Sequence, residues 1–223
     1  MDGTGEYDDG IIMAMMFVAF ALDRRYFQTL RFPGTSMRQP VRTLNAENIN
    51  AIKTAFEQSL DCLGASIQGK HGVQLLTTMK REKVGAGPYP QVTLFEAANR
   101  IMSDLVILNG IAGLLREKTF PFTEYTVEFG NEDKNGFDIR ASSPSATLIG
   151  EAFNVAPSFF QGKKSSALRK LRHAGAAARY KLLMFNSDAT AEHYSAKHEP
   201  GTYHIAVDIA SGKISVRCAP VTA

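Results

Sequence analysis

The feature that most constrains the fold is a change in the spacing of apolar residues after Pro121. Before it, residues 93–115 show helical spacing, and Thr93 and Glu96 have the positions of a capping box, in which a hydroxyl and a carboxylate bind the free amides of the first turn. After it, apolar and polar residues alternate with the period of two that is typical of strands. A long helix is therefore expected to precede a β-sheet.

The alternating region predicts three strands, at 124–129, 137–141 and 146–155, with the first two joined through a polar turn. Further along, the same reasoning predicts a helix, a strand, a short helix and two strands, in this order: Ser165 or Ser166 to Ala174, 179–185, 189–197, 203–209 and 213–218. This order predicts an α/β or α+β fold with a central mixed β-sheet flanked by helices.

The first third of the chain predicts a helical extension, so that we expect an N-terminal extension over residues 1–90 and an α/β core over 91–223. Residues 11–22 are apolar nearly all round a helix and too few to span a bilayer. They predict a buried helix or the contact of a homodimer. A second helix is expected from Asn45 or Asn48 to about Leu63.

The polar, turn-rich stretch 65–92 is expected to connect the second helix to the long one. An acidic N-terminus differs from a secretory signal, which is basic, so we expect a soluble, cytoplasmic protein without a membrane partner. Several kinds of site are excluded by missing motifs. Two distant cysteines and five histidines without metal-binding spacing argue against zinc, and neither a phosphate-binding loop nor a nucleophile elbow occurs.

Charge is segregated along the chain. The thirty-six residues between Glu151 and Asp188 contain no carboxylate, although the net charge of the whole protein is only +3. They contain seven basic residues: Lys163, Lys164, Arg169, Lys170, Arg172, Arg179 and Lys181. Such a segment attracts phosphate, so Arg169, Lys170 and Arg172 are expected to bind a nucleic-acid backbone. The alternative is an ordinary solvated helix surface.

Two carboxylates stand inside predicted strands, Asp138 between Phe137 and Ile139, and Glu151 between Gly150 and Ala152. Burial of a carboxylate is costly unless it is paired, hydrogen-bonded or bound to a metal. Two such acids can hold Mg²⁺ or Mn²⁺, which would make a nucleophile from water and neutralise charge on a phosphate. A structural alternative for Asp138 is an ion pair at the sheet surface with Arg140.

These residues and the element order resemble the PD-(D/E)XK nuclease superfamily, whose fold is that of restriction endonucleases. The resemblance covers about 93–210 and implies that Asp138 and Glu151 are metal ligands and catalytic residues. The position of the family's lysine holds Phe153, so the resemblance implies that Lys163 or Lys164 supplies the amine. It also implies that Glu96 is a further metal ligand; the alternative, which the capping box indicates, is a capping role alone.

The function expected on this basis is metal-dependent endonuclease activity, of a restriction or genome-defence type, on DNA rather than RNA. Phe153 favours a second hypothesis, a catalytically silent nucleic-acid-binding or assembly subunit that keeps the nuclease fold. A third hypothesis is an interaction protein that oligomerises through residues 11–22.

Overall fold

A seven-stranded sheet forms the centre of the computed structural model, which describes residues 42–130, 136–174, 178–197 and 199–217. The strands lie side by side in the order in which they occur in the chain. They are β1 (Arg42–Asn45), β2 (Glu124–Val127), β3 (Ile139–Ser143), β4 (Ala146–Phe153), β5 (Tyr180–Asn186), β6 (Thr202–Val207) and β7 (Ile214–Val216).

The sheet is mixed, as the sequence predicted. The pairs β1–β2, β2–β3 and β3–β4 are antiparallel, β5 is parallel to β4 and to β6, and β7 returns antiparallel to β6. The parallel step from β4 to β5 contains the helix α5 (Pro157–Ala174), because parallel neighbours need a crossover connection. The predicted α/β fold with a central mixed sheet and flanking helices is therefore confirmed.

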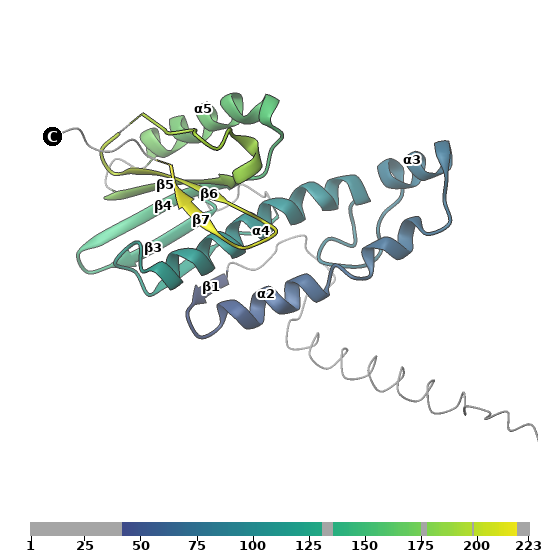
Figure 1. Ribbon diagram of the computed structural model, residues 1–223. Coiled ribbons are helices and arrows are strands. Elements are labelled where there is room, and N and C mark those ends of the chain that lie inside the picture. The colour runs from purple at the N-terminus through teal and green to yellow at the C-terminus, as the bar shows by residue number, and fades with distance from the viewer. Residues whose placement is uncertain (1–41, 131–135, 175–177, 198, 218–223) are drawn as a thin grey trace, which may run out of the picture. The chain divides into compact units, whose positions relative to one another are not determined.

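Helices cover both faces of the sheet (Figure 1). α4 (Leu94–Glu117) packs on one face, where Ile111 lies in the same buried cluster as Leu182 and Met184 of β5. α5 packs on the other face, where Phe160 joins Leu183 and Phe185 of the same strand. Successive residues of β5 thus serve opposite faces, as the alternation of side chains along a strand requires.

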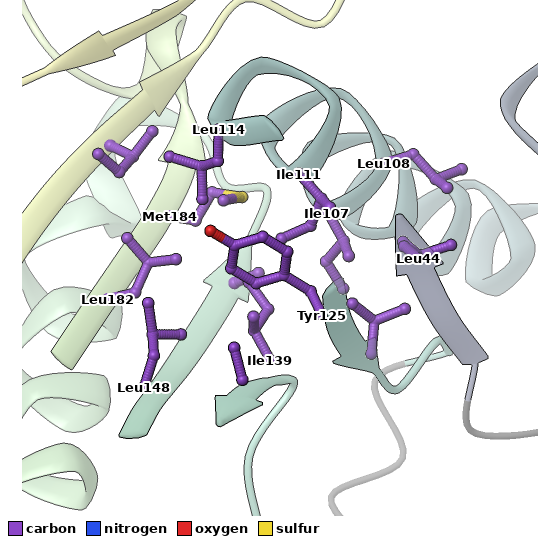
Figure 2. Close-up of a cluster of buried hydrophobic side chains, with 14 of the residues drawn as sticks. Leu44, Ile107, Leu108, Ile111, Leu114, Tyr125, Ile139, Leu148, Leu182 and Met184 are labelled. Carbon is purple, nitrogen blue, oxygen red and sulfur yellow. The ribbon is translucent and has the colours of Figure 1, made fainter. Parts of the chain in front are cut away.

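The larger core lies between α4 and the sheet (Figure 2). Tyr125 of β2 stands at its centre, and its hydroxyl points toward Leu114, Leu182 and Met184. The close approach of α4 to β5 depends on Gly110, since a Cβ atom there would lie 2.1 Å from the sulfur of Met184. α4 is also the one described helix with the length and apolar composition of a membrane span, but 67% of its most apolar stretch is buried, as in the core helices of soluble proteins.

The described part of the predicted extension contributes β1 and three helical segments, α2 (Ile49–Gln58), η1 (Leu63–Ile67) and α3 (Gly72–Arg81). β1 was not predicted, and it pairs with β2 along the edge of the sheet. α2 ends before the predicted Leu63, and α3 forms within the stretch expected to be turns. The predicted helix over 11–22 lies outside the described residues.

Two further expectations are corrected near the sheet. α5 begins at Pro157 rather than at Ser165 or Ser166, because proline suits the first turn of a helix. The predicted helix over 189–197 is wrong: these residues are all described, and they contain only the end of a short 3-10 turn, η2 (Ser187–Ala189). Their backbone instead serves the residue after β7, since Ala196 N donates to the carbonyl of Arg217.

Candidate functional site

Asp138 lies directly before β3, between β2 and β4. Its carboxylate Oδ2 accepts a hydrogen bond of 2.7 Å from Ala152 N of β4, and its carbonyl oxygen accepts one of 2.9 Å from Glu128 N. The side chain thereby continues the pairing of β3 with β4 beyond Ile139, which lies opposite Gly150. Asp138 is thus held at a backbone position next to Glu151.

Glu151 lies on the face of β4 that α5 covers. Its neighbours on this face, Ile149 and Phe153, pack against Leu171 and Phe160 of the helix. The Nζ atom of Lys170 lies 3.0 Å from Oε1 and 3.1 Å from Oε2 of Glu151. The Glu151 side chain is only 12% exposed, so the ion pair satisfies a charge that would otherwise be costly to bury.

The amine that meets Glu151 is therefore that of Lys170, which the sequence analysis assigned to the nucleic-acid backbone. Lys163 is exposed on α5. Lys164 places its amine over the rings of Phe160 and Tyr194, at 5.5 and 5.6 Å from their centroids. Lys170 occurs two helical turns after Lys163, and the sequence alone did not show which turn of α5 passes over Glu151.

Phe153, at the position of the family's lysine, belongs to the core. Its ring is 2% exposed and stacks on Phe185, with 6.2 Å between the centroids and 21° between the planes. Phe160 of α5 packs against both rings. This position of β4 is thus part of the contact between the sheet and α5.

The basic segment is partly balanced by acids from elsewhere in the chain. Arg172 donates two hydrogen bonds, of 2.9 and 2.8 Å, to the carboxylate of Glu199, and this pairing lowers the pKa of Glu199 and raises that of Arg172. Lys170 is paired with Glu151. Of the three residues expected to bind phosphate, Arg169 is exposed and the other two are in ion pairs. The segment between Glu151 and Asp188 contains no acidic residue, but in the folded chain Glu151 and Glu199 pair with two of its basic residues.

Glu96 takes part in the capping of α4. Its amide donates to Thr93 Oγ1 at 3.3 Å, which confirms the hydroxyl half of the predicted capping box, whereas its carboxylate lies 2.6 Å from the guanidinium of Arg100. Among the described residues no three His, Cys, Asp or Glu side chains come together as a group that could hold a metal ion. The structure therefore does not join Glu96 to Asp138 and Glu151 as a third ligand.

A buried carboxylate that the sequence analysis missed lies on α4. Asp104 is fully buried and accepts hydrogen bonds from the hydroxyl of Tyr89 and, at 2.9 Å, from Gly130 N. Burial raises the pKa of Asp104 to about 7; the negative charge of nearby Asp138 adds to this, whereas the two hydrogen bonds oppose it. The signal was present, since Asp104 interrupts an otherwise apolar stretch of the helix.

Comparison of the chain with protein-family models and with curated proteins gives no match. The site must therefore be interpreted from its own chemistry. Asp138, just before β3, and Glu151 of β4 offer carboxylate oxygens as ligands, and Mg²⁺ is commonly held by one or two carboxylates while it keeps several waters. The donor atoms fit such an ion in type.

Proposed function

We propose that the protein is a metal-dependent nuclease that hydrolyses phosphodiester bonds, in DNA in preference to RNA, within the cytoplasm. The observation that carries the proposal is the contact of the Lys170 amine with Glu151, beside Asp138. The order of α4, the three antiparallel strands β2 to β4, α5 and the parallel strand β5 supports it, because the same order is implied by the resemblance to the PD-(D/E)XK superfamily.

Each residue has a role in this proposal. Asp138 and Glu151 would hold Mg²⁺ or Mn²⁺, which when bound supplies an activated water and neutralises charge on the phosphate. The ammonium group of Lys170 orients the attacking water and stabilises negative charge as it develops on the phosphate oxygens. Arg169, which is exposed on α5, attracts the nucleic-acid backbone.

Cleavage assays on single- and double-stranded DNA and RNA, with Mg²⁺ or Mn²⁺, test the proposal. Glu151→Gln and Lys170→Met are each expected to reduce cleavage by at least about 100-fold, the usual contribution of a group that assists proton transfer or stabilises charge. Lys163→Met, on the same helix but exposed, is the matched control and is expected to keep cleavage within about threefold. Cleavage that survives Glu151→Gln in a folded protein would refute the assigned site.

The burial of Phe153 favours a second candidate, a catalytically silent subunit that binds nucleic acid. Because a core aromatic side chain replaces the lysine, the fold can persist without the chemistry. This candidate predicts binding that weakens steeply as salt is raised, since phosphate contacts release counterions, and no cleavage with either metal. Binding is to be measured between about 50 and 200 mM salt. Salt-sensitive binding without cleavage separates this candidate from the active enzyme.

A further inference from the structure

A buried polar cluster joins three separate parts of the chain beside the candidate site. It consists of Asp104 of α4, Tyr89 of the preceding loop and Gly130 just after β2. Tyr89 is 6% exposed and Asp104 is fully buried. Arg42 of β1 and Arg100 of α4 are the cations whose charge acts on this cluster, and Asp138 is the nearby anion.

The backbone at Gly130 is shaped for this cluster. Its φ of +92° is a conformation that side-chain-bearing residues rarely adopt. A Cβ atom at this position would also lie 3.3 Å from the ring and the hydroxyl of Tyr89. Glycine therefore allows the amide to reach the carboxylate of Asp104 while the tyrosine packs against it.

Three hydrogen bonds, joined by short stretches of backbone, lead from Asp104 to the candidate site. Asp104 accepts from Gly130 N; two residues earlier, Glu128 N donates to the carbonyl of Asp138. The carboxylate of Asp138 in turn accepts from Ala152 N, next to Glu151. The same helix also reaches the end of β4 directly, because Ser103 Oγ accepts a bond of 3.4 Å from Asn154 N.

We infer that Asp104 is a positioning residue, which holds the end of β2 and thereby sets the place of the Asp138 carboxylate beside Glu151. The role of Asp104 in a metal site rests on the proposed function, whereas the hydrogen bonds that hold the end of β2 do not depend on it. Asp104 acts on the site through its hydrogen bond with the Gly130 amide, and its charge also acts on Asp138.

Amide signals of the ¹⁵N-labelled chain test the inference. In Asp104→Leu, which removes the acceptor but keeps the volume, the Ala152 amide signal is expected to shift and its hydrogen exchange to accelerate at least about tenfold, the effect of one lost buried hydrogen bond. Asp104→Asn keeps an acceptor for Gly130 and is expected to restore the wild-type signals. Tyr89→Phe removes the other contact and serves as the matched control, with the Ala152 signal unchanged.

Binding of Mn²⁺, followed by the broadening of the Ala152 signal, separates the inference from the proposed function. We expect affinity to fall about tenfold in Asp104→Leu and to recover in Asp104→Asn. The Ala152 signal can shift in Asp104→Leu and recover in Asp104→Asn although Mn²⁺ does not bind the wild type. In that case the metal-dependent function fails, and the positioning role of Asp104 stands. If Mn²⁺ binds but the Ala152 signal is the same in the leucine variant, the inference alone is overturned.

If Asp104→Leu does not fold, the inference can still be tested directly on the wild-type protein. Scalar couplings across the hydrogen bonds are expected between Gly130 N and the Asp104 carboxyl carbon, and between Ala152 N and the Asp138 carboxyl carbon. Absence of either coupling would break the series at that link and refute the inference.

Discussion

Tyr125 brings a hydroxyl group into the middle of an apolar core (Figure 2). Within the part of the chain that the structure describes, this hydroxyl has no hydrogen-bond partner, and burial raises the pKa of Tyr125 to about 12. A buried polar group without a partner costs about 1–3 kcal/mol. The ring itself is well packed, with Phe122 at 6.2 Å in an edge-to-face contact.

Tyr125→Phe is therefore expected to increase the free energy of unfolding by about 1 kcal/mol, as measured by urea denaturation. Tyr89→Phe is the control, because its hydroxyl donates to Asp104 and its loss should lower stability by about 1–2 kcal/mol. A loss of stability in Tyr125→Phe would show that the hydroxyl contributes to the core.

Single residues also show how far the sequence could define the site. Asp138 and Glu151 were found because a carboxylate is unusual inside an apolar strand. Lys170 could not be chosen over Lys163 and Lys164, since the choice depends on where α5 begins and which turn crosses β4. Glu199, which pairs with Arg172, follows it by twenty-seven residues, and such a contact depends on the folded chain.

At the scale of elements, α4 and α5 use glycine differently. Gly110 of α4 faces β5, where a side chain would collide with Met184. Gly162 of α5 has nothing within 4 Å of the position that a Cβ atom would take. The first glycine allows close packing, whereas the second only adds freedom to the unfolded chain and lowers helix propensity.

Gly110→Ala is expected to lower the free energy of unfolding by about 1–3 kcal/mol, because the added methyl group forces Met184 to move in a packed core. Gly162→Ala, the matched change, should raise it by about 0.5–1 kcal/mol. Thermal or urea unfolding of the two variants measures both effects. Equal shifts in the same direction would contradict the packing of α4 on β5.

The sequence predicted the capped helix α4 and the strands β2 to β6. Their apolar residues stand in alternating or continuous runs that turn-forming or capping residues bound. The 189–197 segment was predicted as a helix from local propensity, but tertiary hydrogen bonds to Arg217 determine its conformation. α3 was missed because the polar, turn-forming residues of 65–92 were interpreted as a connection; the helix is largely exposed, Val73 and Leu76 included.

At the scale of the whole molecule, two buried groups give stability opposite dependences on pH. Burial raises the pKa of Asp104 from 3.8 to about 7, so that the folded state holds a proton that the unfolded state has released. Burial, together with the charge of Lys164, lowers the pKa of His204 from 6.5 to about 4, so that the folded state lacks a proton that the unfolded state binds. Between about pH 4 and 6.5 the two effects oppose each other.

The variants Asp104→Asn and His204→Gln are expected to separate these effects. In Asp104→Asn, where residue 104 no longer titrates, the free energy of unfolding should rise with pH from about 4 to 6.5, because the unfolded state loses the proton on His204. In His204→Gln, where His204 no longer titrates, the free energy of unfolding should fall as pH rises from about 4 to 7. Each slope is about 1.4 kcal/mol per pH unit at most, measured by urea unfolding at several pH values. Parallel curves for the two variants would contradict the assignment.

The order of the strands has a consequence for how the molecule is made. Every hydrogen-bonded neighbour of a described strand is also its neighbour along the chain. The sheet can therefore grow at one edge while the polypeptide emerges from the ribosome, and none of these strands has to be inserted between two that have already met. The strand order thus allows the sheet to assemble in the direction of synthesis.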